Sequence, residues 1–197
     1  MSSSTRYSTA LAHLFSAGAS VWAFRALRNN PYYRSTWAYG TLGLFFVNST
    51  VGVLRYGISN PEYGDKVAKV SRKTLLVGLV CGLPCIAAEL YLYYGYRRDV
   101  AFAHLGSTLI PVAVQLLMGS NSARNSVDWV TAGNLLSIFV VTFLESNYYG
   151  LAMTACYTVN YFLITTVGYL FEHVPALDLF QYGLCFFHYF IVKSLDN

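Results

Sequence analysis

Three side chains that can exchange protons lie within strongly apolar stretches of this sequence: Glu89, His104 and His188. A carboxylate paired with an imidazole can act as a general base, pass a proton along a relay or help to bind a metal ion. Glu89 lies late in its stretch, His104 early in the next one and His188 late in the last. Antiparallel helices would place all three at a similar depth, so we predict one polar site made of these residues.

A second set of polar residues is expected towards the opposite ends of the same stretches. It consists of Asn48, Gln115, Asn134 and Asp178. Polar side chains in an apolar helix must find partners, because an unpaired one is costly to place in hydrocarbon. The alternative to a functional role is therefore structural: Glu89 would hydrogen-bond to a Tyr or a His and only hold the helices together.

Motifs for known reactions are missing from the chain. The histidines have neither the HxxxH nor the HExxH spacing, and GxSxG, GxGxxG and Walker sequences do not occur. Four cysteines lie in apolar stretches, where they are expected to act as small hydrophobic residues: Cys81, Cys85, Cys156 and Cys185. We expect no bound metal and no cofactor, and the sequence leaves open whether the protein is an enzyme.

The candidate residues are carried by seven long apolar stretches. Of the 197 residues, 55% are hydrophobic and 11% are charged, against roughly 25% charged in ordinary soluble domains. Each stretch is near the ~20 residues that a helix needs to cross a bilayer. We predict an all-α, polytopic transmembrane helical bundle of about seven spans, with six as the alternative, that forms one domain over residues 1–197 without a soluble domain. The predicted spans are 9–27, 36–56, 74–96, 100–118, 128–146, 149–171 and 176–193.

Small residues and prolines indicate how the third and fourth spans pack. One face of the third span carries small residues, which would let another helix approach closely, followed by a carboxylate. These residues are Gly78, Gly82, Cys85 and Glu89. Pro84 and Pro111 each remove a backbone hydrogen bond and are expected to kink their helices. Short polar turns predict antiparallel neighbours, and residues 57–73 are polar enough to lie along the membrane surface.

Basic residues do not determine the orientation of the chain in a membrane. The 13 Lys and Arg residues divide seven to six between the two predicted sides of the membrane, so the positive-inside bias favours neither orientation. The first 61 residues contain five Arg and no Asp or Glu, which also suits mitochondrial import. An amphipathic import helix would overlap the first span, however, so we favour an endomembrane, the endoplasmic reticulum, over the mitochondrial inner membrane.

Two classes of function are consistent with this inventory. Basic residues lie at the ends of apolar stretches rather than in a run, which excludes nucleic acid as a partner. The first hypothesis is a non-catalytic membrane protein that binds lipid, a hydrophobic ligand or a membrane partner, including a second copy of itself as a homo-oligomer. The second is an intramembrane lipid hydrolase or a proton-coupled small-solute carrier that uses the Glu/His site. We prefer the first, because the polar residues suffice for helix packing and no reaction motif is present.

Overall fold

The computed structural model describes residues 7–31, 33–57, 61–118, 120–164, 169–170 and 174–196. Nearly all of this part of the chain is helical, as the sequence predicts. Within it, four helical segments are long and apolar enough to cross a membrane: Trp37–Gly57, Gly64–Tyr93, Arg98–Met118, which includes a turn at residues 107–108, and Arg124–Leu144.

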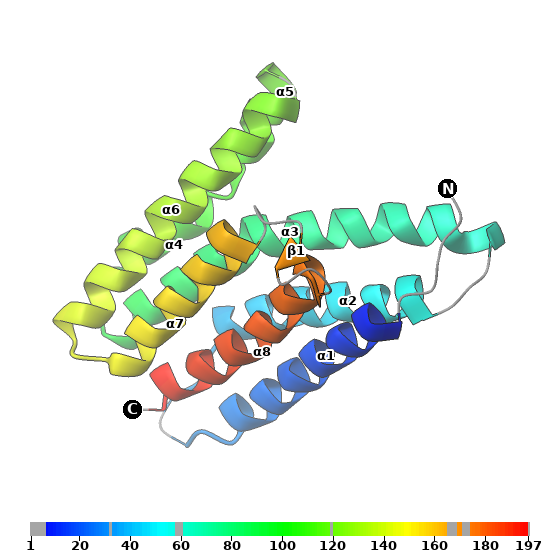
Figure 1. Ribbon diagram of the computed structural model, residues 1–197. Coiled ribbons are helices and arrows are strands. Elements are labelled where there is room, and N and C mark those ends of the chain that lie inside the picture. Colours follow the sequence, from blue (N-terminus) through cyan, green and yellow to red (C-terminus); the bar gives the residue numbers. More distant parts are fainter. Residues whose placement is uncertain are drawn as a thin grey trace.

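The helices follow one another with short connections (Figure 1). The first three are α1 (Tyr7–Arg28), α2 (Trp37–Gly57) and α3 (Pro61–Tyr93). The next three are α4 (Arg98–Gly106), α5 (Leu109–Met118) and α6 (Ser120–Leu144). They are followed by α7 (Tyr148–Thr158), the π-helix η1 (Val159–Ile164) and α8 (Ala176–Ser194). Before α8, two strands of two residues each, β1 (Tyr169–Leu170) and β2 (Val174–Pro175), pair antiparallel.

The pairs α1–α2, α2–α3, α5–α6 and α7–α8 run antiparallel, whereas the first and last helices run parallel (Figure 1). Thr41, early in α2, donates a hydrogen bond at 2.7 Å to the carbonyl of Gly82, late in α3. At the other end of the same pair, Arg55 donates to Ser71. By contrast, α1 and α8 lie side by side in the same direction, which brings segments from the two ends of the chain together.

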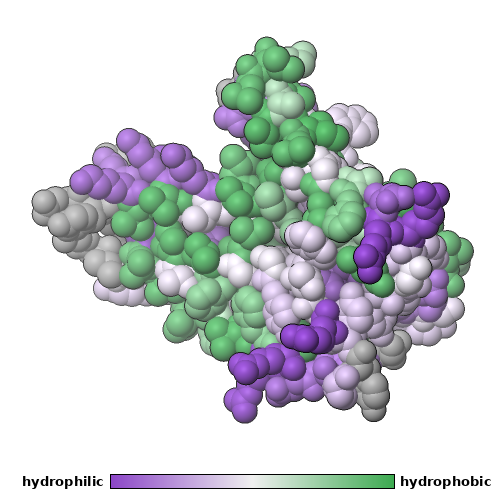
Figure 2. Space-filling model, turned by 180° about the vertical axis from the view of Figure 1, so that it is seen from behind, coloured by the Kyte–Doolittle hydropathy of each residue, from purple (hydrophilic) through white to green (hydrophobic). Residues whose placement is uncertain are grey.

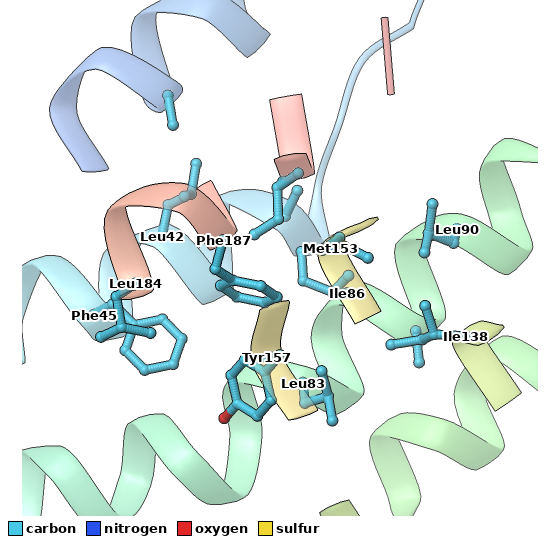
Figure 3. Close-up of a cluster of buried hydrophobic side chains, with 14 of the residues drawn as sticks. Leu42, Phe45, Leu83, Ile86, Leu90, Ile138, Met153, Tyr157, Leu184 and Phe187 are labelled. Carbon is cyan, nitrogen blue, oxygen red and sulfur yellow. The ribbon is translucent and has the colours of Figure 1, made fainter. Parts of the chain in front are cut away.

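The α2–α3 contact is close because α3 presents glycines to α2. A Cβ added at Gly82 would lie 3.0 Å from the Phe45 ring, and one added at Gly78 would lie 3.4 Å from it. Phe45 is fully buried there, in a core that also contains Leu83 and Phe187 (Figure 3). The predicted small-residue face of the third span is thereby confirmed.

The two prolines lie in different surroundings. Pro84 lies inside α3, which continues past it, and the kink expected there stays a prediction. Upstream of Pro111, the predicted fourth span divides into α4 and α5, with a turn at Ser107 and Thr108. A proline cannot donate to the carbonyl four residues before it, and that carbonyl belongs to Ser107.

Several predicted boundaries differ from the structure. Residues 61–73 form the first turns of α3 instead of a separate connection, because residues 65–73 contain neither Gly nor Pro and include several good helix formers. In the predicted sixth span, the described helical residues reach Ile164, and residues 169–170 belong to the strand pair. The remaining residues of that span, 165–168 and 171, lie outside the described part of the chain.

A hairpin of α5 and the first half of α6 projects away from the other helices (Figure 1). It bears the most exposed aliphatic side chains of the described residues, with Leu116 82% and Leu117 84% accessible. Figure 2 shows this projection as a largely hydrophobic surface. Its apolar residues are therefore not covered by the rest of the bundle.

Candidate functional site

Glu89 lies at the N-terminal end of α2. Its Oε2 atom accepts the backbone N–H of Thr36 at 2.9 Å and that of Ala38 at 2.8 Å, and it also accepts the N–H of Trp37. The first N–H groups of a helix have no partner within the helix. A carboxylate satisfies them and interacts favourably with the positive end of the helix dipole. Glu89, which is 1% exposed, thus caps α2 from the neighbouring helix.

Tyr33, in the connection before α2, completes the surroundings of this carboxylate. Its phenol hydrogen-bonds to Glu89, and burial together with that bond raises the Tyr33 pKa above its usual value. Every group that contacts the Glu89 oxygens in these bonds is a donor. The carboxylate is therefore occupied as an acceptor, which favours a structural role over that of a general base.

His104 on α4 lies between two polar residues of α6. Its Nδ1 atom is 2.8 Å from Asn134 Oδ1, and its Nε2 atom is 3.1 Å from Ser137 Oγ. The Asn134 amide nitrogen donates to the carbonyl of Val130 at 2.8 Å, so its Oδ1 is the acceptor facing the imidazole. Nδ1 therefore donates to Asn134 Oδ1, and in the tautomer that carries its proton on Nδ1 the Nε2 atom can accept from Ser137 Oγ.

A tyrosine of α3 extends this group. Tyr91 OH lies 2.7 Å from Ser137 Oγ, and the Tyr91 ring centroid is 5.0 Å from that of His104. The order hydroxyl, imidazole, amide is that of a nucleophile, its base and the residue that orients the base. The same contacts also join α3, α4 and α6, which is what interhelical hydrogen bonds do in a helix bundle.

His188 on α8 has a third, separate environment. It is fully buried, its Nδ1 atom is 3.4 Å from Ser20 Oγ, and its ring packs beside Phe45 and Phe187. Among the described residues, no hydrogen bond or ring contact joins Glu89, His104 and His188 to one another. Each has its own neighbours, and their action as one site stays a prediction from the sequence.

Buried polar side chains instead form a line between α1, α2 and α8, which we call the polar seam. Its members are Thr9, His13, Ser16, Ser20, Ser49, Asp178, Gln181 and His188, and each is at most 3% exposed. Thr9 donates to Asp178 at 2.7 Å. Further along, Ser49 donates to Ser16 at 3.0 Å and lies 3.4 Å from the Gln181 carbonyl oxygen. Polar contacts therefore hold the three helices together along several turns.

The second predicted set is divided among different places. Asp178 belongs to the polar seam, and Asn48 is buried beside Thr74, whose hydroxyl lies 3.3 Å from its Oδ1. Asn134 bonds to His104, whereas Gln115 is exposed on α5. Because α6 begins at residue 120 instead of the predicted 128, Asn134 lies near the middle of that helix, where it contacts His104 of α4.

Most of the polar seam was not predicted from the sequence, although the spacing of polar residues in the first helix indicates it. Thr9, His13, Ser16 and Ser20 are spaced at four, three and four, which places them on one face of a helix. Large apolar residues of the same segment lie on the other faces of that helix. Among the described residues, no group of three or more His, Cys, Asp or Glu side chains could hold a metal ion.

The fold and these contacts define a class: an α-helical bundle with polar side chains buried between its helices and four helices apolar enough to cross a membrane. Residues 33–193 match the family model described as a domain of unknown function, DUF4791. The match covers most of the chain, which therefore belongs to the DUF4791 family. No curated protein and no solved structure matches it.

Proposed function

We propose that this chain is a multi-spanning integral membrane protein that is non-catalytic and binds membrane lipid with its outer surface. The observation that supports this most is the distribution of side chains around α1. Ser16 and Ser20 face the interior and are fully buried, whereas Leu14 is 56% and Phe15 is 55% exposed. A helix in water has the opposite distribution, while a helix in lipid places small and polar residues at its contacts with other helices.

The other helices support the same interpretation. Large apolar side chains are exposed on α5, α6 and α8, among them Ile110, Leu116, Leu117, Trp129, Leu136, Phe143 and Phe186. Soluble proteins rarely expose apolar patches larger than a few hundred Å². Lipid chains would solvate these side chains, and the polar seam would remain buried inside the bundle.

Seven crossings are the count that we favour. Besides the four apolar helices, α1, α8 and the combined segment of α7 and η1 would each cross once. The buried polar residues of α1 and α8 lower the mean hydropathy of these helices, although their outer faces are apolar. The endoplasmic reticulum remains the favoured compartment, because an amphipathic mitochondrial import helix would overlap the first span.

A binding role is favoured over catalysis because Glu89 and His104 are engaged in contacts between helices. Glu89 accepts three backbone N–H groups at the start of α2. His104 has a partner at each ring nitrogen. These bonds connect different helices, and such connections stabilise a bundle without any reaction.

Alkaline carbonate extraction of membranes from cells that express the full chain tests the proposal. The protein should stay in the membrane pellet at pH 11 and enter solution only with detergent. Release of the protein by carbonate alone would contradict the membrane assignment.

A second candidate function, an intramembrane hydrolase, is favoured by the group around His104. Ser137 Oγ would attack an ester carbonyl while His104 Nε2 takes its proton, and the imidazolium would then give that proton to the leaving alcohol. Water would release the acyl group from Ser137 in the second step, and Asn134 would hold the orientation of the ring.

Labelling with a fluorophosphonate probe distinguishes the two candidates. A hydrolase would be labelled at Ser137, and Ser137→Ala and His104→Ala would both abolish the label. Thr50→Ala, at an exposed hydroxyl of α2, is the control and should not affect it. The binding role that we favour predicts no label on Ser137 in the folded protein.

A further inference from the structure

An apolar groove runs along the outside of the bundle between α2 and α3. Its volume is about 570 Å³, and it is lined by Tyr39, Gly40, Gly43, Leu44, Val47, Lys73, Thr74 and Val77. Five of these eight residues lack any polar side-chain group, and Lys73 brings the one charge. The groove therefore offers an apolar surface with a cationic residue beside it.

Two glycines of α2 create the space. A Cβ added at Gly43 would meet the Phe24 ring at 3.8 Å, and one added at Gly40 would meet Cys85 Sγ at 3.7 Å. Both distances are ordinary contacts. Gly40 and Gly43 both line the groove without a side chain, and an alanine at either position would make only ordinary contacts.

The charged residue lies at one end of the groove. Because α2 and α3 are antiparallel, Val47 lies at the level of Thr74, as the contact of its neighbour Asn48 with Thr74 indicates. Tyr39 lies eight residues earlier in α2, which is ~12 Å along a helix. The groove therefore extends from Lys73 towards Tyr39, with its apolar part on one side of the charge.

The cationic end continues along α3. Lys66, Lys69 and Lys73 are spaced at three and four, so they share one face of the helix, and Val77 follows on that face. Neither α2 nor residues 66–88 contain Asp or Glu. Among the described residues, none of these lysines forms an ion pair. Figure 2 shows the first part of α3 as a hydrophilic surface beside hydrophobic surface.

We infer that the groove binds an anionic phospholipid. One acyl chain lies along Gly40 and Gly43, and the phosphate lies at Lys73 and Lys69. The inference rests on the proposed membrane location, which places the outside of the bundle in contact with lipid. A lysine ammonium is a suitable partner for phosphate, and basic residues beside a membrane span attract anionic lipids. The apolar lining complements the acyl chain.

Native mass spectrometry of the full chain in detergent tests the inference. The protein is titrated with phosphatidylglycerol and phosphatidylcholine that carry identical acyl chains. We expect a preference for phosphatidylglycerol, and a loss of about fivefold in its affinity for Lys73→Gln, from the contribution of one lysine near a membrane surface. Arg98→Gln, an exposed cation at the start of α4, is the control and should keep the preference.

Filling the groove tests the acyl-chain part separately. Gly43→Leu should lower the affinity for both lipids, whereas Gly133→Leu, on α6 where a Cβ would meet nothing within 4 Å, should not. Gly43→Ala provides a milder change if the leucine variant does not fold. Equal binding of both lipids by the wild type, or equal behaviour of Gly43→Leu and Gly133→Leu, would overturn the inference. Failure here with retention after carbonate extraction would leave the membrane assignment intact.

Discussion

The backbone N–H of Ala38 in α2 donates to the carboxylate of Glu89 in α3 at 2.8 Å. The two residues are 51 positions apart, so this bond fixes the start of one helix to the side of another. Side-chain caps usually come from the residue just before a helix. Here the cap comes from α3, which couples the formation of α2 to its packing.

Substitution of Glu89 should therefore reduce stability. Glu89→Gln keeps an accepting oxygen but loses the charge at the helix end, and we expect a cost of about 1 kcal/mol. Glu89→Leu leaves the N–H groups without an acceptor and should cost on the order of 2–3 kcal/mol. Denaturant unfolding in detergent measures both. An unchanged stability of both variants would disagree with the capping role.

Tyr33 should make stability depend on alkaline pH. Its folded-state pKa is raised above the usual 10.0 by burial and by the bond to Glu89. The contribution of the phenol is therefore fully present below pH 10 and is lost as the pH rises above it. In thermal unfolding of wild type and Tyr33→Phe, the advantage of the wild type should shrink above pH 10. A gap that widens there would show the opposite sign.

Gly52 should not tolerate a side chain. A Cβ at this position would overlap the ring of His13, which stacks on Tyr56 with centroids 5.7 Å apart. We expect Gly52→Ala to cost about 1–3 kcal/mol through overpacking. Gly133→Ala is the matched control, because it enters open space and should be neutral or slightly stabilising. Equal unfolding midpoints for the two variants would argue against the contact between α1 and α2.

His104 and Asn134 should be energetically coupled. A double-mutant cycle with His104→Ala and Asn134→Ala measures their interaction, for which we expect about 0.6 kcal/mol, the average of hydrogen bonds between membrane helices. The same cycle with His104 and Gln115 is the control, since Gln115 is exposed on α5. Coupling of similar size in both cycles would remove the support for a specific bond.

Much of the helical architecture could be predicted from the sequence, because apolar length and short polar turns determine where helices lie. The glycine face of α3 was also readable, since Gly78 and Gly82 have helical spacing. Boundaries were harder to predict. Residues 61–73 are polar, and polarity alone does not distinguish a surface connection from the first turns of a longer helix.

Contacts between polar residues were the least predictable feature. Sequence position gives the depth of a residue along its helix, but not the direction in which its side chain points. Glu89 was expected beside a histidine, yet it lies against the backbone of α2. No residue type marks a backbone N–H as a partner, so only the packing of α2 on α3 reveals this cap.

Spin labelling tests the central claim, that the outer faces of the helices contact lipid. Nitroxides are placed at Leu14 and Leu136, which are exposed and apolar, and at Arg98 as a water-facing control. The variants are made in a background in which the four cysteines are replaced by alanine, and they are reconstituted in vesicles. We expect the Leu14 and Leu136 labels to collide often with oxygen and rarely with a water-soluble nickel chelate, unlike the Arg98 label. Collision with the nickel chelate at the same high rate at all three positions would contradict the central claim.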